Sequence, residues 1–140
     1  MAMCCDLRYA TPQAYFKEAF VNIGLTIDGG ASWLLPRLVG SGKALELCYT
    51  GDDFPAVEAE RLGLVNRVLE ADRLEPHVRA LGERLAAGPA AALGAIKRSV
   101  NHAATSTLEE AVDFEFLLQG VMMEGEESRE RVRAFLERRT

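Results

Sequence analysis

The segment that most constrains how this chain can fold joins a short apolar run to an acid and then to two glycines. It reads Gly24-Leu25-Thr26-Ile27-Asp28-Gly29-Gly30 and continues as an apolar helical stretch to Gly40. Glycine tolerates backbone conformations that other residues avoid, so the chain can turn sharply here and a ligand can approach the backbone closely. The pattern therefore predicts a carboxylate, that of Asp28, at a turn that leads into a helix.

Composition and charge exclude several classes of function. The 140 residues carry a formal net charge of −5, whereas a nucleic-acid-binding surface would be basic. No apolar run approaches the roughly 18 residues that span a membrane, and the first residues lack the pattern of a secretory signal. Cys4, Cys5 and Cys48 lack metal-binding spacing, which predicts reduced, buried thiols of a cytoplasmic protein and no metal site. We expect His77 and His102 to be surface or packing residues.

Residues 1–66 have a mixed pattern of short strands, turns and short helices. The compact apolar run 2–10 predicts a buried strand, and Thr11-Pro12-Gln13 interrupts it. Pro55 begins a helix in the first-turn position that proline favours, and Gly63 ends it. We also expect short strands at 14–16 and 64–69 and a helix at 43–49.

Residues 67–140 are predicted to be almost entirely helical. Thr107 and Glu110 have the spacing of a capping box, in which each side chain bonds the other residue's backbone N–H at the start of a helix. The helix that they open is apolar on more than one face, so it needs cover from another domain or another subunit. The expected helices span 72–87, 90–104, 107–123 and 126–139.

Several stretches of this chain resemble the crotonase (enoyl-CoA hydratase/isomerase) superfamily, and the match is to the C-terminal half of such an enzyme. The resemblance implies an α/β, crotonase-like (ClpP/crotonase spiral) fold. Residues 1–66 would be the C-terminal part of its spiral core, and residues 67–140 a helical region for trimerisation and for covering CoA. The matching stretches are Met3-Cys4-Cys5-Asp6-Leu7-Arg8-Tyr9-Ala10, Phe16, Gly24-Leu25, Asp28-Gly29-Gly30, Leu35-Pro36-Arg37-Leu38-Val39-Gly40, Thr50-Gly51, Gly63-Leu64-Val65 and the closing helix from Val132.

The resemblance implies that the reaction depends on groups outside this chain. Family members are longer, and the segment with the two backbone N–H donors of the oxyanion hole would precede Met1. Loss of one such donor costs roughly 10²–10³ in rate, so the chain alone is expected to be inactive. In the hydratases, a glutamate follows the short strand, and the register places Phe20 at that position. Phenylalanine cannot transfer a proton, which disfavours a two-glutamate hydratase.

Asp28 is the alternative proton carrier. Several isomerases of the superfamily, including the phenylacetate-pathway isomerase, place their working acid in a Gly-Leu-x-Pro-Asp-x-Gly-Gly segment, which this chain resembles except for Ile27 in place of proline. The resemblance thus implies isomerisation of an enoyl-CoA double bond, with Asp28 as the catalytic residue. The competing interpretation is that Asp28 only caps the following helix.

Other residues could contact the substrate. The candidates are Phe20, Gly29, Trp33, Lys97 and Arg138, with Trp33 either lining the acyl pocket or packing in the core. Lys97 and Arg138 could reach the phosphates of CoA, although ordinary solvation at helix ends is an alternative. We expect Glu18 to face solvent and Arg37 to pair with an acid at the surface.

The resemblance also predicts partners. An acyl-CoA thioester would be the substrate, no cofactor is needed because coenzyme A is part of that substrate, and the chain would form a homo-oligomer, a trimer or a hexamer. The implied setting is cytoplasmic fatty acid metabolism, with hydratase (lyase) chemistry as the family's other activity. A different class of function stays open: a truncated, non-catalytic chain could act as an oligomerisation module or need a partner chain.

Overall fold

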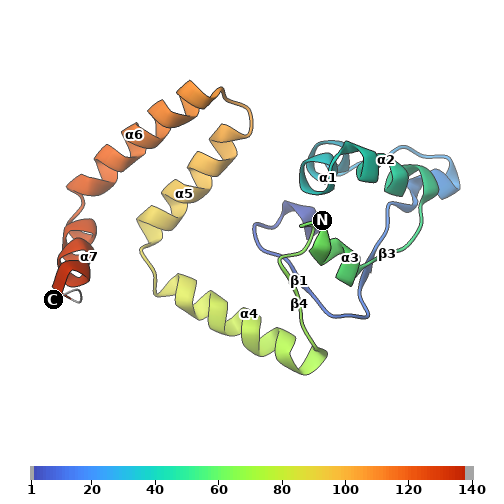
Figure 1. Ribbon diagram of the computed structural model, residues 1–140, viewed down its shortest axis with the longest axis horizontal. Helices are drawn as coiled ribbons and strands as arrows, with labels where there is room; N and C mark the ends of the chain where they lie inside the picture. Colours follow the sequence, from blue (N-terminus) through green and yellow to red (C-terminus); the bar gives the residue numbers. More distant parts are fainter. Residues whose placement is uncertain (1, 138–140) are drawn as a thin grey trace. The chain divides into compact units, whose positions relative to one another are not determined.

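The computed structural model describes residues 2–137. Its internal contacts divide the chain into two compact units, Met1–Arg79 and Ala80–Thr140. The division falls inside a single helix, α4 (Ala71–Ala86), rather than at a loop (Figure 1). Each unit therefore has its own arrangement of elements.

The first unit combines four very short strands with helices. Strand β1 pairs in parallel with β4, with Tyr9 opposite Arg67, and β2 pairs antiparallel with β3, with Phe16 opposite Phe54. These pairings bring together residues that lie far apart in the sequence. The elements are η1 (Ala2–Cys4), β1 (Tyr9–Ala10), β2 (Tyr15–Phe16), η2 (Ala19–Ile23), α1 (Ala31–Val39), α2 (Ser41–Thr50), β3 (Phe54–Pro55), α3 (Ala56–Arg61) and β4 (Arg67–Val68).

The strand predicted over residues 2–10 is wrong for most of its length. Ala2–Cys4 form a 3₁₀ turn, and Tyr9–Ala10 alone make a strand. The physical reason is pairing: a strand needs a neighbour for its backbone groups, and β4 is only two residues long. Cys4 and Cys5 are consequently exposed rather than buried, and Cys48 is half-buried; all three are free thiols.

The core of the first unit lies between α1, α2, α3 and the strands. Ala56 and Ala59 have no exposed surface, so their small side chains let α3 pack closely against its neighbours. This core holds α1 in place, and α1 begins directly after the segment that contains Asp28. The core residues are Ala10, Leu35, Ala44, Leu47, Phe54, Ala56, Ala59, Leu64 and Val65.

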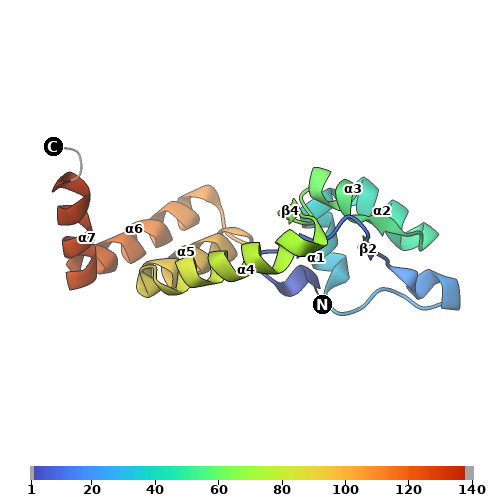
Figure 2. The ribbon, with the colours of Figure 1, turned by 90° about the horizontal axis from the view of Figure 1, so that it is seen from below.

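The second unit contains α5 (Ala90–Ala103), α6 (Leu108–Glu124) and α7 (Glu126–Glu137). Helices α5 and α6 lie side by side in both views (Figures 1 and 2). The predicted capping box is confirmed: the Thr107 hydroxyl accepts from the Glu110 N–H at 3.2 Å, and the Glu110 carboxylate accepts from the Thr107 N–H at 2.8 Å. Among residues 2–137, no helix is long and apolar enough to cross a membrane.

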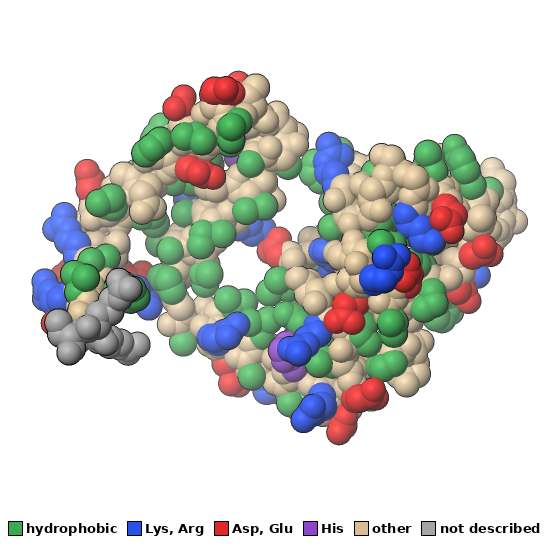
Figure 3. Space-filling view, viewed as in Figure 1, with side chains coloured by type: hydrophobic (Ala, Val, Ile, Leu, Met, Phe, Trp, Pro, Cys, Tyr) green, Lys and Arg blue, Asp and Glu red, His purple; other side chains and the backbone are tan. Residues whose placement is uncertain are grey.

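Helix α6 buries none of its residues within this chain. Phe116 is 73% exposed and Leu117 is 70% exposed, and Ile96 and Val100 of α5 are exposed as well. Hydrophobic side chains gather over α5 and α6 in the space-filling view (Figure 3). A solvated surface of this kind is typical of an interface that another chain or segment covers.

Candidate active site

Asp28 lies in the turn between η2 and α1. Its backbone carbonyl accepts a hydrogen bond from the Ala31 N–H at 3.0 Å, while its side chain is exposed. The N-cap of α1 is Gly30, and no side chain caps the helix. The interpretation of Asp28 as a side-chain cap is therefore wrong: the carboxylate is not used to end the helix.

Two left-handed glycines make this turn possible. Gly29 has φ +58° and Gly30 has φ +83°, a region that side chains with a β-carbon rarely adopt. A β-carbon at Gly29 would meet no atom within 4 Å, so the requirement for glycine there comes from the backbone conformation and not from crowding. The predicted sharp turn beside the acid is confirmed.

Phe20 belongs to η2, the 3₁₀ helix that leads toward Asp28. Its ring is half-buried, and its carbonyl accepts the Leu25 N–H at 3.0 Å. Gly24 ends η2 in the left-handed conformation, with φ +71°. The aromatic side chain thus occupies a structured position close in sequence to Asp28, and it offers no group that could exchange a proton.

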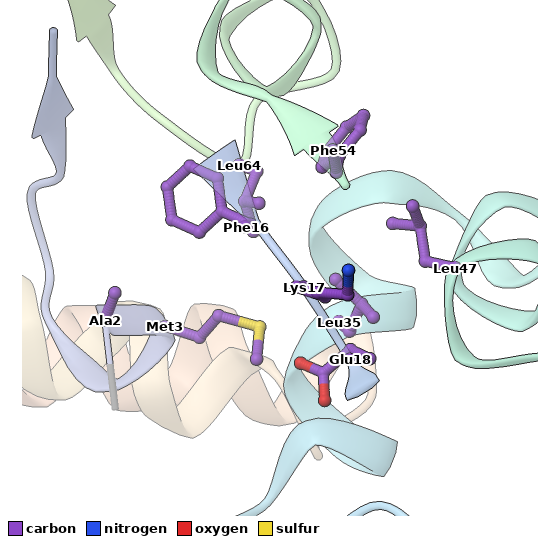
Figure 4. A pocket seen from close by; sticks show the side chains of 9 residues that line it. All are labelled: Ala2, Met3, Phe16, Lys17, Glu18, Leu35, Leu47, Phe54 and Leu64. Carbon is purple, nitrogen blue, oxygen red and sulfur yellow. The ribbon is translucent and has the colours of Figure 1, made fainter. Parts of the chain in front are cut away.

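Glu18 is half-buried, so its expected exposure to solvent is wrong. It lines a cavity of about 150 Å³ together with Phe16 and Leu35, and its carboxylate turns toward Met3 (Figure 4). Burial raises the pKa of Glu18, and the negative charge of Asp28 raises it further. The neighbouring Lys17 ammonium bonds Asp53 instead, at 2.8 Å.

Sequence reasoning missed Glu18, although a signal was present. Side chains alternate between the two sides of an extended segment, so Glu18 falls on the same side as the half-buried Phe16, two residues earlier. The charge of Asp28 adds to the raised pKa of Glu18, although burial is the main cause. Glu18 lines the cavity of about 150 Å³ and not the larger apolar cavity beside Asp28, so it is a neighbouring carboxylate and not a second member of the candidate site.

An apolar cavity of about 620 Å³ adjoins this turn. Ile27, the residue before Asp28, lines it, as do Leu25 and Leu35. Cys48 lies at its wall, and burial raises the pKa of this thiol, with a further increase from the charge of Glu18. The cavity has the size and apolar lining of a small-molecule pocket.

Trp33 lies on the first turns of α1, and its side chain is not in the core. It is 44% exposed, and the Arg37 guanidinium stacks over its ring at 3.8 Å from the ring centre. Arg37 also donates to the Trp33 carbonyl at 2.9 Å. Core packing, one of the two alternatives for Trp33, is therefore wrong. Among residues 2–137 Arg37 stacks on Trp33, one helical turn away, and pairs with no acid, so its expected ion pair is wrong as well.

The remaining candidates lie elsewhere. Phe20, Asp28, Gly29 and Trp33 fall on consecutive segments of the first unit, whereas Lys97 is an exposed residue of α5 in the second unit. Arg138 lies outside the described residues. Four of the predicted residues are thus close together in the sequence, but none of them is among the residues that line the apolar cavity. The two predicted CoA-phosphate contacts stay predictions.

Known proteins match the chain along its whole length. The family model for enoyl-CoA hydratase/isomerase matches residues 1–140. Crotonyl-CoA hydratase of Syntrophomonas wolfei is 36% identical over 139 residues, which cover 99% of this chain and 54% of that protein. The 1,2-epoxyphenylacetyl-CoA isomerase of Escherichia coli is 34% identical over 140 residues, which cover 100% of this chain and 53% of that protein.

Solved structures agree with this result. A crystal structure of an enoyl-CoA hydratase subunit I from Geobacillus kaustophilus superimposes with a TM-score of 0.94 at 37% identity, over 99% of this chain and 54% of that one. The architecture is therefore that of the crotonase-like α/β fold, represented by a C-terminal part. The chain belongs to the enoyl-CoA hydratase/isomerase family, and it spans about half the length of the curated relatives it matches.

Proposed function

We propose that this chain supplies the C-terminal part of an enoyl-CoA isomerase, in which Asp28 moves a proton between two carbons of the acyl group. The observation that carries the proposal is the state of Asp28: its carboxylate is exposed at a glycine turn, and it caps no helix. The adjoining apolar cavity is consistent with an acyl substrate. Phe20 stands where the hydratases of the family have a glutamate, so that second proton carrier is missing.

The chemistry follows from the acidity of a thioester. The Asp28 carboxylate would take a proton from one carbon of the enoyl group, and the electron pair of the broken C–H bond would move into a conjugated enolate on the thioester oxygen. The protonated Asp28 would then return that proton to a different carbon, which shifts the double bond. Backbone N–H donors stabilise such an oxyanion, and we propose that a segment other than residues 1–140 supplies them. Coenzyme A enters as part of the substrate, so no separate cofactor is proposed, and we place the reaction in the cytoplasm.

The experiment that tests the proposal uses this chain together with a segment that supplies the oxyanion donors. Asp28→Asn should lower isomerisation of an enoyl-CoA by roughly 10²–10⁴-fold, the usual contribution of a proton-transferring group. Thermal stability should not change, because the exposed Asp28 side chain makes no cap bond. Asp52→Asn, at another exposed acid, is the matched control. Retained turnover in Asp28→Asn would remove Asp28 from the mechanism.

An assay for hydration of crotonyl-CoA distinguishes an isomerase from a hydratase. The Syntrophomonas wolfei relative is named a crotonyl-CoA hydratase. Since Phe20 stands where the family's second glutamate is expected, we predict no hydration at rates typical of enzymes, which are on the order of 1–10³ per second. The measurement is the loss of enoyl absorbance in the same completed protein. Turnover in that range would reassign the proton-transfer residue.

A second function is favoured by the exposed apolar surface of α6. Phe116 and Leu117 are largely exposed, and a homotrimer would cover such side chains. We propose that the chain is a homo-oligomer, with three copies as the basic assembly. A chain that assembles but gives no turnover when the oxyanion donors are supplied would be an oligomerisation module instead of an enzyme.

A further inference from the structure

A basic cavity in the first unit is lined by residues of β4 and α4 and of the link between them. Figure 1 shows β4 leading into α4. Its volume is about 510 Å³, which is within the range of small-molecule pockets. The residues that line it are Arg67, Leu69, Asp72, Arg73, Pro76 and His77. None of them is used by the proposed chemistry at Asp28, so the cavity needs its own explanation.

The two arginines at this cavity have no side-chain partner among residues 2–137. Other arginines of the unit are engaged: Arg61 pairs with Glu58, and Arg79 pairs with Glu75. Arg67 and Arg73 are exposed at the cavity, although the chain carries a net charge of −5 and offers many acids. Two guanidinium groups are thus available to a ligand.

The side chains at this cavity belong to two elements, β4 and α4. Arg67 is held in β4, whose backbone pairs with Tyr9 of β1. Arg73 and His77 are four residues apart on α4, so they share one face of the helix. The Tyr9 ring meets the His77 ring edge-on, with 5.1 Å between the ring centres. A strand and a helix therefore present cationic or hydrogen-bonding groups to a common space.

We propose that this cavity binds a phosphate group. A guanidinium presents a planar fork of N–H donors that matches two oxygens of a phosphate, and two such forks suit a doubly charged oxyanion. The His77 imidazole contributes a further donor. Asp72 lines the same cavity, and its negative charge repels a bound anion. Neutralising Asp72 should therefore raise the affinity for phosphate, whereas neutralising either arginine should lower it. The proposal does not depend on the isomerase function.

The experiment titrates this chain with inorganic phosphate at constant pH and ionic strength, while NMR follows the His77 ring resonances. We expect saturable shifts at millimolar phosphate or below. Arg67→Gln and Arg73→Gln should each weaken binding about tenfold, the loss expected for a charge-assisted bidentate contact. Asp72→Asn should strengthen binding. Arg98→Gln, at an exposed arginine of α5 in the other unit, is the matched control and should bind like the parent.

Two further measurements complete the experiment. One identifies the source of the phosphate, and the other distinguishes a loss of binding from a loss of folding. The site would be assigned to a phosphate carried on a larger ligand if adenosine 3′-phosphate binds more tightly than inorganic phosphate and adenosine does not bind. If the two phosphates bind equally, the site would be assigned to the free ion. Arg73→Lys keeps the charge and loses the fork, so it should bind between the parent and Arg73→Gln. Absence of saturable shifts, or equal affinity in the parent and both arginine variants, would overturn the proposal.

Discussion

The two units of this chain differ in where their apolar side chains lie. The first unit encloses a core in which Leu64 is 1% exposed and Phe54 is 2% exposed. Among the described residues of the second unit, Ala95 alone is buried, while Phe116 and Leu117 remain mostly exposed. Both units expose large apolar side chains, since Ile23 is 73% exposed and Tyr49 is 71% exposed in the first unit. The difference is that the first unit also buries a core within this chain, whereas the described part of the second unit buries almost none.

The proposed active site and the proposed assembly surface therefore belong to different units. Asp28, the glycine turn and the adjoining cavity all depend on a core that the first unit makes for itself. The second unit has well-formed helices, since capping and local contacts suffice for them, but it gains little from burial in this chain. Covering a large apolar side chain is worth about 1.5–3 kcal/mol, so association would stabilise the second unit most.

The largest effect that would test this comparison is a core truncation. Leu64→Ala should lower the free energy of unfolding by about 2–5 kcal/mol, because it removes buried apolar atoms and enlarges the cavity that Leu64 lines. Leu117→Ala removes the same atoms from an exposed site, and in dilute, monomeric chain it should change stability by no more than about 0.5 kcal/mol. Urea unfolding measures both. Equal losses in the two variants would mean that the second unit has a core of its own.

A smaller effect concerns assembly. Light scattering at micromolar concentration should give the mass of a trimer, and Phe116→Asp should shift it toward the monomer, because an unpaired charge would have to be buried at the interface. Glu115→Asp, a conservative change at the preceding residue, serves as the control. A stable monomer of the parent chain would contradict the proposed role of α6.

The smallest effect is the pH dependence that Glu18 contributes. Burial raises the pKa of Glu18 above its value in the unfolded chain, so the folded state holds this proton more tightly. The resulting stabilisation is complete below the unfolded pKa and is lost as pH rises through the folded pKa. Glu18→Gln removes this dependence, so the variant should gain stability relative to the parent above that window. Thermal unfolding across pH 3 to 8 measures it; parallel curves would show that Glu18 is fully solvated.

Much of the helical region could be predicted from sequence. The capping box at Thr107 and Glu110 and the helices that became α5, α6 and α7 follow from residues three and four apart, which decide helix formation locally. The turn at Asp28 was equally local, since two glycines in succession supply the required backbone conformation. Burial was harder: the extent of the first strand, the exposure of Trp33 and the half-burial of Glu18 all depend on which distant segment packs against each residue.

The family, the helices of the C-terminal region and the acid at a glycine turn can be recognised from the sequence, because they depend on residues that are close together along the chain. The structure was needed to show that Tyr9 pairs with Arg67, that Glu18 is half-buried at a cavity, and that Arg67 and Arg73 line one cavity. Such contacts join positions that are separated in sequence, and their free energies depend on the packing of the whole unit rather than on any local pattern.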